Sequence, residues 1–362
     1  MNSHRHHLVL LPPNRVWRTY RGGRTLDALG GAPTPADSSF PEDWVASTTR
    51  ATNVGRESIA EGVSQVVING ESHDLARLVA ADPIYFLGER HLARFGTDLR
   101  LLVKLLDSSI RLHFQVHPTA EFAQRFLGSP SGKTEAYHVL TTRPEVANPS
   151  IYLGFQRPPS RDALKQMIES QDIAGIEACF DRVPVKPGDT YLVPGGMPHA
   201  LGEGVFLIEI QEPSDLVVRF EFERGGYVLP ESARFMNRGL DFCLDLFDFT
   251  PRPLSDILSH QACPPRRLRQ LGVRSFEDEL IGTDRTACFR VTQLHLHEPV
   301  TRETSAASIA IVTAGEVSVR VGTEVHHLRR YDKFLLPAGL GRHELIPQTS
   351  AEILVCHPPC ST

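Results

Sequence analysis

Short runs of β-branched and aromatic residues, separated by glycine and proline, constrain the fold of this chain most strongly. Glycine and proline number 27 each in 362 residues and are spread along the whole sequence. This punctuation predicts many short strands joined by turns, as in β-sandwiches and barrels. The expected strands are VSQVVING (63–70), RLHFQVH (111–117), DTYLVPGG (189–196), VFLIEIQ (205–211), LVVRFEF (216–222), SIAIVTAGEVSVRV (308–321) and DKFLLPAG (332–339).

Two segments depart from this pattern and are expected to be helical. Residues 74–95 and 160–178 combine helix formers with apolar residues at helical spacing. Pro83 interrupts the first segment, and Ser160 is suited to cap the second. The chain is therefore expected to be mainly β with a helical insertion.

A weak internal repeat indicates how the chain is divided into domains. VKPGDTYLVPGGMPHAL (185–201) and LRRYDKFLLPAGLGRHEL (328–345) share the order basic residue, Asp, aromatic residue, apolar pair, Pro, Gly and His. We interpret each as the same hairpin used twice. Because 362 residues exceed the usual size of one domain, two β-barrel domains account for the length best.

Composition excludes several classes of partner. The formal net charge is −5 and well mixed, and no basic run resembles a nucleic-acid-binding surface. No apolar stretch approaches the roughly 18–20 residues of a membrane span, so a cytoplasmic protein is expected. The six cysteines are scattered rather than arranged in C-x-x-C pairs, and we interpret them as free thiols, with metal binding by Cys356 and Cys360 as the lesser alternative.

Four polar residues form a candidate metal site. Gln115 and His117 lie two apart in an expected strand, so both side chains point the same way. With Glu135 and His199 they form a mixed oxygen and nitrogen set suited to Zn²⁺ and acceptable to Mn²⁺ or Co²⁺. Each residue alone also fits an ordinary structural role. The apolar surroundings of both histidines favour a shared ligand, because an unpartnered buried imidazole is costly.

The strand 205–211 carries a second set of polar residues. Gly202 and Gly204 flank an expected turn, so this strand is predicted to run back beside the strand that ends at His199. Glu209 and Gln211 share one face of it. In a barrel with a polar interior both line a pocket, whereas in a purely structural strand Glu209 faces water.

Two charged residues follow this strand. Arg219 stands four residues after Asp215. The pair is either a surface ion pair or a cation that faces an anionic substrate.

These motifs together resemble a known family. QVHP (115–118), GKTEAYHVL (132–140) and VPGGMPHALGEGVFLIEIQEPSDLVVR (193–219) are similar to the type I phosphomannose isomerases, a zinc-dependent cupin family. The stretches WRTYRGGRTLDALGG, FPEDWVAST and LLVKLLDSS also resemble the N-terminal part of that family. The resemblance covers about residues 14–225. It implies two cupin, or jelly-roll, barrels: a metal-binding catalytic domain over 1–236 and a second domain without metal over 237–362.

The resemblance also implies roles for individual residues. One Zn²⁺ per chain is expected on Gln115, His117, Glu135 and His199. The expected catalytic residues are Lys133, Glu209 and Arg219, and the expected substrate-binding residues are Asp215, Gln211 and His113. His113 departs from the family, which more often has a small residue there.

The expected reaction interconverts mannose 6-phosphate and fructose 6-phosphate through an enediol, with a small sugar phosphate as the partner. The alternatives are an isomerase of a non-phosphorylated sugar and a non-catalytic sugar-binding cupin. The C-terminal barrel is either such a binding module or a structural part of the enzyme, because His343 and the pair His326 and His327 lack the ligand spacing of the first barrel.

Overall fold

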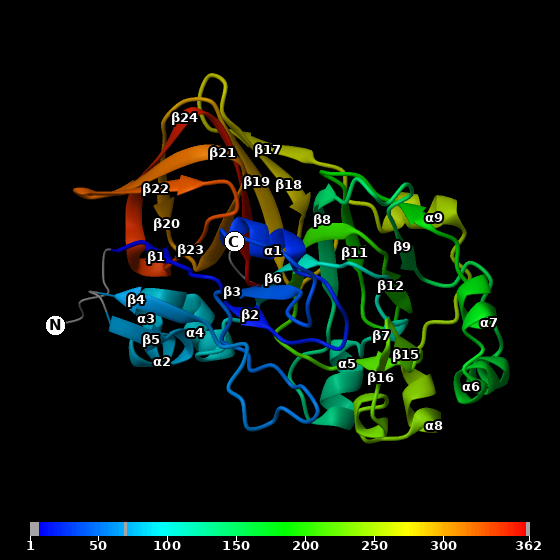
Figure 1. Cartoon of the computed structure of the whole chain (residues 1–362). Coiled ribbons are helices and arrows are strands. Elements are labelled where there is room, and N and C mark those ends of the chain that lie inside the picture. Colours follow the sequence, from blue (N-terminus) through cyan, green and yellow to red (C-terminus); the bar gives the residue numbers. More distant parts are fainter. Residues whose placement is uncertain (1–6, 69–70, 360–362) are drawn as a thin grey trace.

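The computed structural model describes residues 7–68 and 71–359, and antiparallel strands dominate it (Figure 1). The chain is thus mainly β, as the sequence predicted. The largest sheet has nine strands, and the other two large sheets have six and five. The strands 63–70 and 332–339 are found in shortened form, and positions 69 and 70 lie outside the described residues.

The nine-stranded sheet is built almost entirely from the C-terminal third of the chain. Its strands are β1 (Val9–Leu10), β17 (Arg266–Gln270), β18 (Phe276–Ile281), β19 (Arg290–Leu296), β20 (Val300–Thr304), β21 (Ser308–Val321), β22 (Glu324–Arg329), β23 (Lys333–Leu336) and β24 (Gly341–His357). The sheet curves around its own apolar interior (Figure 1), which includes Val312, Val319, Phe334 and Ile353. β1 brings the start of the chain into this sheet by pairing with β23.

The six- and five-stranded sheets are built from the middle of the chain. The first contains β2 (Arg15–Val16), β3 (Glu42–Val45), β6 (Leu102–Asp107), β8 (Glu135–Thr142), β11 (Thr190–Val193) and β13 (Val205–Gln211). The second contains β7 (Gln115–Val116), β9 (Ser150–Leu153), β10 (Val183–Pro184), β12 (His199–Leu201) and β14 (Val218–Arg219). Two hairpins stand apart, β4 (Gln65–Ile68) with β5 (Glu71–Asp74), and β15 (Glu223–Arg224) with β16 (Tyr227–Val228).

Both segments that departed from the strand pattern are helical. The first contains α2 (Leu75–Ala81), α3 (Pro83–Leu87) and α4 (Glu89–Phe95), and the second α6 (Arg161–Ser170) and α7 (Ile173–Ala178). Pro83 begins α3, where a missing N–H costs nothing, and the Ser160 side chain accepts a hydrogen bond from the backbone N–H of Ala163. The remaining helices are α1 (Arg24–Leu29), α5 (Ala120–Phe122), α8 (Leu240–Cys243) and α9 (Leu254–His260), with single turns η1 (Ala123–Leu127), η2 (Glu231–Ala233), η3 (Leu244–Leu246) and η4 (Ala338–Leu340).

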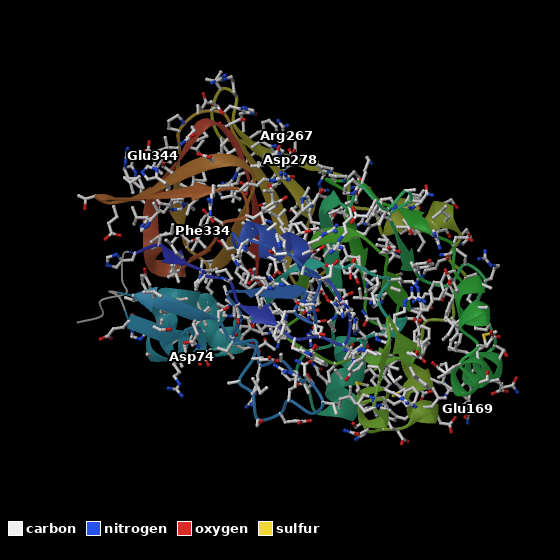
Figure 2. The ribbon with its side chains drawn as sticks, in the orientation of Figure 1. Asp74, Glu169, Arg267, Asp278, Phe334 and Glu344 are labelled. Atoms are coloured by element: carbon white, nitrogen blue, oxygen red, sulfur yellow. The ribbon has the colours of Figure 1, made fainter. Side chains whose placement is uncertain are left out.

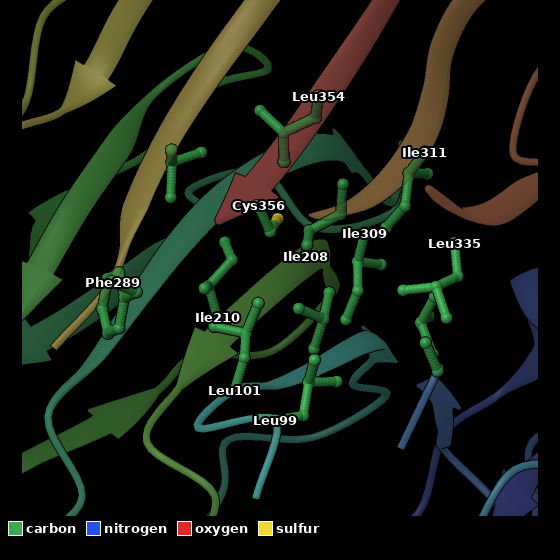
Figure 3. Close-up of a cluster of buried hydrophobic side chains, with 14 of the residues drawn as sticks. Leu99, Leu101, Ile208, Ile210, Phe289, Ile309, Ile311, Leu335, Leu354 and Cys356 are labelled. Carbon is green, nitrogen blue, oxygen red and sulfur yellow. The ribbon is translucent and has the colours of Figure 1, made fainter. Parts of the chain in front are cut away.

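One apolar cluster joins the six-stranded sheet to the nine-stranded sheet (Figure 3). Ile208 and Ile210 of β13 are fully buried in it, together with Ile309 of β21 and Leu354 of β24. These isoleucines occupy one face of β13 and leave Glu209 on the other, which is the alternation predicted for this strand. Burying the aliphatic face between two sheets therefore fixes the direction in which Glu209 points.

The expected hairpin between residues 199 and 211 is wrong. β12 pairs with β7 and β9, whereas β13 pairs with β6 and β8 in the other sheet. A side chain at Gly202 would meet the carbonyl oxygen of Ser150 at 1.9 Å, so the connection packs closely on β9 as it crosses between sheets. The glycines thus mark a tight crossing rather than a two-stranded turn.

The repeated segments also do not form hairpins. In the first copy, β11 and β12 lie in different sheets. In the second copy, β23 and β24 lie in one sheet but do not pair with each other, because β23 pairs with β21 and β1. Each copy is instead a strand, a turn containing Pro194 or Pro337, and a second strand that pairs elsewhere. A shared order of residues predicted the shared local path but not the pairing partners.

Two strands are shorter than their apolar runs predicted. Within 111–117 only Gln115 and Val116 form regular ladder pairs, and within 216–222 only Val218 and Arg219. The flanking backbone is still hydrogen bonded, since the N–H of Leu112 donates to the carbonyl of Leu201 and that of Phe220 donates to Phe114.

Cys179, Cys243, Cys263, Cys288 and Cys356 are free thiols, and Cys360 lies outside the described residues. None of the helices among the described residues has the length and apolar character of a membrane span.

Candidate metal centre and active site

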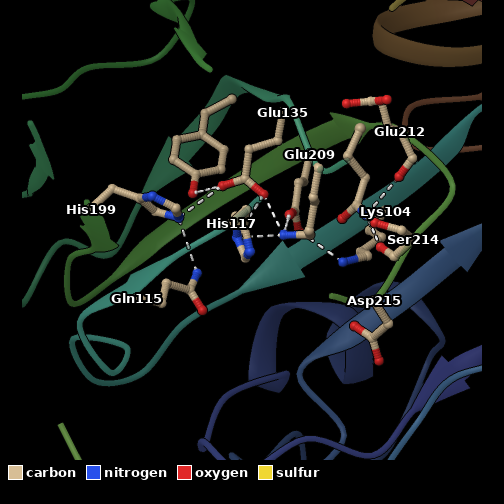
Figure 4. A network of polar contacts seen from close by, with 12 residues as sticks. Lys104, Gln115, His117, Glu135, His199, Glu209, Glu212, Ser214 and Asp215 are labelled. Atoms are coloured by element: carbon tan, nitrogen blue, oxygen red, sulfur yellow. Dashed lines mark hydrogen bonds and ion pairs between the residues drawn. The ribbon is translucent and has the colours of Figure 1, made fainter. Parts of the chain in front are cut away.

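Strand pairing brings the four predicted metal ligands together (Figure 4). His199 is the first residue of β12 and stands opposite Gln115 of β7. Glu135 is the first residue of β8 in the other sheet. The Nε2 atom of His199 lies 3.1 Å from Glu135 Oε1, and the Nε2 atom of His117 lies 3.4 Å from Glu135 Oε2. Both sheets therefore present ligand atoms to one point.

Backbone carbonyls orient both imidazoles. His117 Nδ1 lies 2.9 Å from the carbonyl oxygen of Leu216, and His199 Nδ1 lies 2.8 Å from that of Met197. A carbonyl only accepts, so each Nδ1 carries the hydrogen and donates it. Each Nε2 is then unprotonated and can accept, which is the form that binds metal.

The donor set fits a divalent cation. Ligand atoms of His117, Glu135 and His199 lie within 4.8 Å of one another, and this trio is the sole His, Cys, Asp and Glu group of that kind across residues 7–68 and 71–359. All three side chains are at most 2 % exposed. The amide of Gln115 lies 3.2 Å from His199 Nε2, and rotating that amide places its oxygen on the same side. Buried acceptors that converge on one point require a positive charge.

Lys133 supplies positive charge beside these acceptors. Its Nζ donates to His117 Nε2 at 2.8 Å, to Glu209 Oε1 at 3.3 Å and to Glu135 Oε2. Burial acts to lower the pKa of Lys133, but Glu135 and Glu209 outweigh it and raise that pKa. Burial and the charge of Lys133 lower the pKa of His117 to about 3, so this imidazole stays neutral near pH 7.

Glu209 lies between two buried ammonium groups. Lys104 Nζ is 3.2 Å from Glu209 Oε2, and Lys133 Nζ is 3.3 Å from Oε1. Burial raises the pKa of Glu209, while the two lysines act in the opposite direction. Glu209 is 4 % exposed and lines a cavity of 40 Å³ together with Gln115, His117 and Lys133. A carboxyl group with a raised pKa beside a metal position is suited to proton transfer.

Charged residues close the rim of this cavity. Arg18 donates to both oxygens of Asp215, at 2.9 and 3.0 Å, so Asp215 pairs with Arg18 rather than forming the alternative surface pair with Arg219. Burial raises the pKa of Asp215, but Arg18 outweighs it and holds that pKa below its usual value. Arg219 also lines the cavity and donates to the carbonyl oxygen of Ala233.

His113 and Gln211 differ in where they lie. His113 lines the cavity, as expected, and its Nδ1 donates to the carbonyl oxygen of Glu221 at 3.0 Å. Burial and then Arg219 lower the pKa of His113 to about 3. Gln211 does not line the cavity, which corrects its expected position: its amide donates to the backbone of Glu212 and Ser214 and thereby holds the loop that carries Asp215.

Sequence reasoning missed several residues of the site. Arg18, Glu42 and Lys104 form a buried charged chain behind Glu209, and Tyr137 donates to Glu135 Oε1. Lys104 had a signal, because a lysine stands alone inside the apolar run LLVKLLD. A charge that interrupts a buried strand requires a partner from elsewhere in the fold.

No family model matches the chain. Among curated proteins, it is 26% identical over 266 residues to the mannose-6-phosphate isomerase ManA of Bacillus subtilis, a match that spans 72% of this chain and 76% of the relative. It is 36% identical over 130 residues to GmuF of the same organism, named a probable mannose-6-phosphate isomerase. That second match spans 36% of this chain and only 39% of the relative's length.

Solved structures have the same fold. The mannose 6-phosphate isomerase from Bacillus subtilis matches with a TM-score of 0.73 and 22% identity, covering 97% of this chain and 99% of that one. A zinc-bound mannose 6-phosphate isomerase matches with a TM-score of 0.71 and 16% identity, covering 97% and 99%. These comparisons confirm the resemblance to the type I phosphomannose isomerases, and they support the expectation of an isomerase enzyme.

Proposed function

We propose that this chain, a relative of the type I phosphomannose isomerases, interconverts mannose 6-phosphate and fructose 6-phosphate. The observation that carries the proposal is the convergence of Gln115, His117, Glu135 and His199 beside Glu209 (Figure 4). The relatives named mannose-6-phosphate isomerase support the choice of substrate.

We assign one Zn²⁺ per chain to this ligand set. His117 and His199 would offer Nε2, Glu135 a carboxylate oxygen and Gln115 its amide oxygen, a set suited to zinc. Zinc bound there would supply Lewis-acid stabilisation of the charge that develops on the sugar oxygens. The zinc-bound structure among the similar folds supports this metal.

Glu209 is our candidate for the proton shuttle. The reaction removes a proton from the carbon next to a carbonyl and returns it one carbon away, through an enediol. Lys133 Nζ connects the Glu209 carboxylate to His117 and Glu135, and the raised pKa of Glu209 favours both accepting and returning that proton. Lys133, hydrogen bonded to Glu209, stabilises negative charge that builds up on the substrate oxygens.

The cations at the rim favour a phosphorylated substrate over a free sugar. Arg219 lines the cavity, and we assign it to the phosphate or the oxyanion. We assign Asp215 and His113 to accept hydrogen bonds from sugar hydroxyls, and Gln211 to support the loop of Asp215.

We also propose the domain division that was expected from the sequence. A catalytic cupin domain over 1–236 would contain the six- and five-stranded sheets with the helical insertion, and a second cupin domain over 237–362 the nine-stranded sheet. β1 and α9 cross this division, because β1 pairs with β23 and Ile257 of α9 packs with residues of the five-stranded sheet.

Steady-state kinetics with a measured zinc content test the function. We expect kcat/KM for mannose 6-phosphate to exceed that for mannose by orders of magnitude, and Glu209→Gln to lower kcat by about 10²–10⁴-fold with zinc retained. Glu145→Gln, an exposed glutamate paired with Arg24, is the control. Equal kcat/KM values for the two sugars would favour the free-sugar isomerase. Absence of turnover by zinc-loaded wild-type protein would favour the sugar-binding cupin.

A further inference from the structure

A second cavity lies inside the nine-stranded sheet, apart from the candidate active site. It measures 440 Å³, which is a size typical of small-molecule sites, and it shares no lining residue with the first cavity. Phe334 lies on its wall between the strands, whereas Glu344 stands on the outside of the sheet (Figure 2). The interior of this sheet is therefore only partly filled by its own side chains.

A buried carboxylate and arginines line one part of this cavity. Glu277 is fully buried, and its Oε2 accepts from Arg269 at 2.6 Å and from Arg302 at 3.2 Å. Glu277 Oε1 has no hydrogen-bond partner. Arg290 Nε is also buried without one, since the nearest carboxylate oxygen, on Glu279, is 3.6 Å away. An unused acceptor and the three arginines Arg269, Arg290 and Arg302 thus line the same space.

His343 adds a second unused acceptor. It is 3 % exposed, and its Nδ1 donates to the carbonyl oxygen of Gly341 at 3.2 Å. Its Nε2 therefore carries a lone pair, and this atom has no partner. His343 is the histidine of the second repeated segment, as His199 is of the first, although it stands one residue further from the proline. The part of the chain that the structure describes gathers no metal-ligand trio around it, so the imidazole is available to a different ligand.

We propose that this cavity binds a small polyhydroxylated anion, of the sugar-phosphate or sugar-acid class. Hydroxyl groups of the ligand would donate to Glu277 Oε1 and His343 Nε2, and its anionic group would accept from Arg290 and Arg302. The apolar wall that includes Phe334 would pack against the carbon chain. Each unused polar atom gains a partner in this arrangement, and no step depends on the proposed isomerase activity.

Methyl NMR of the wild-type, chelator-treated protein maps the ligand directly. Leu294, Leu336 and Val355 line this cavity, whereas Leu106 and Leu201 line the first one. Glucose 6-phosphate, gluconate, mannitol and inorganic phosphate are titrated separately. We expect glucose 6-phosphate or gluconate to shift the first three methyl sets saturably, at least about tenfold more tightly than mannitol or phosphate. The stronger of the two probes identifies the anionic group.

Two matched variants complete the test. Arg302→Gln is expected to weaken that binding at least about tenfold, because a charged donor is lost. Arg320→Gln is the control, since Arg320 pairs with Glu344 on the outside of the same sheet. Thermal unfolding checks that both variants fold. If Arg302→Gln fails to fold, the wild-type titration alone still tests the proposal. The proposal is overturned if the three methyl sets stay fixed with all four probes, or if mannitol or phosphate binds as tightly.

Discussion

His199 stands directly opposite Gln115 in the five-stranded sheet, although 84 residues separate them in the chain. This single register places the two side chains on one face, 3.2 Å apart at their closest nitrogens. Glu135 reaches the same point from the six-stranded sheet. The candidate metal centre thus depends on how two sheets face each other. Substituting the residues that hold its ligands and the adjacent charged groups is therefore expected to change metal affinity, pH dependence or stability.

Removing the hydroxyl of Tyr137 is expected to weaken metal binding. Tyr137 donates to Glu135 Oε1 and so orients a proposed ligand. Loss of such a supporting hydrogen bond typically costs about 10–100-fold in metal affinity, and we expect Tyr137→Phe to lie in this range. Competition with a zinc chelator measures the zinc affinity of each variant. Tyr152→Phe, which removes a hydrogen bond to Glu177, serves as the control, and equal zinc affinity of the two variants would refute the role of Tyr137.

Replacing Lys104 is expected to shift the pH dependence of activity. The ammonium of Lys104 lowers the pKa of Glu209, against the larger effect of burial. Lys104→Met therefore raises the pKa of Glu209 further, so protonated base persists to higher pH. The acid limb of the kcat/KM profile should move to higher pH, because activity is lost as pH falls through that pKa. Lys186→Met alters an exposed lysine and should leave the limb in place. A limb that does not move with Lys104→Met excludes Glu209 as the titrating base.

Neutralising Asp215 is expected to destabilise the fold at neutral pH. Its pKa is depressed by Arg18, so the stability it contributes is present above the unfolded-state pKa and is lost as pH falls towards the folded-state value. Breaking a buried pair costs about 3–5 kcal/mol, and we expect Asp215→Asn to lose about 3 kcal/mol at pH 7. The difference from wild type should shrink below about pH 4.

Urea unfolding at several pH values measures this effect. Asp241→Asn removes an exposed partner of Lys165 and should stay within about 0.5 kcal/mol of wild type. A difference for Asp215→Asn that persists unchanged at acid pH would show that the ion pair with Arg18 is not its source.

Local patterns in the sequence predicted much of this molecule. Alternation along 205–211 predicted that Glu209 and Gln211 share one face, and Ile208 and Ile210 are buried on the other. Helical spacing predicted the helices on either side of Pro83 and the one capped by Ser160. These features depend on neighbours within a few residues, so the sequence carries them directly.

Features that depend on distant partners were not predictable in the same way. The glycines at 202 and 204 indicated a turn between β12 and β13. Whether these two strands share a sheet depends on their partners: β12 pairs with β9, and β13 pairs with β6 in the other sheet. Arg18 pairs with Asp215 across 197 residues, and no local pattern encodes that partner. The roles of Glu42 and Lys104 are likewise set by pairing between β3, β6 and β13.

The position of bound zinc tests the central claim most directly. Crystals of the zinc-loaded protein, measured at the zinc absorption edge, are expected to show one strong anomalous peak per chain. It should lie about 2.0–2.2 Å from Nε2 of His117, Nε2 of His199 and a carboxylate oxygen of Glu135, with the Gln115 amide turned towards it. A peak elsewhere in the molecule, or none at this point, would contradict the assignment of the metal centre and the isomerase proposal that rests on it.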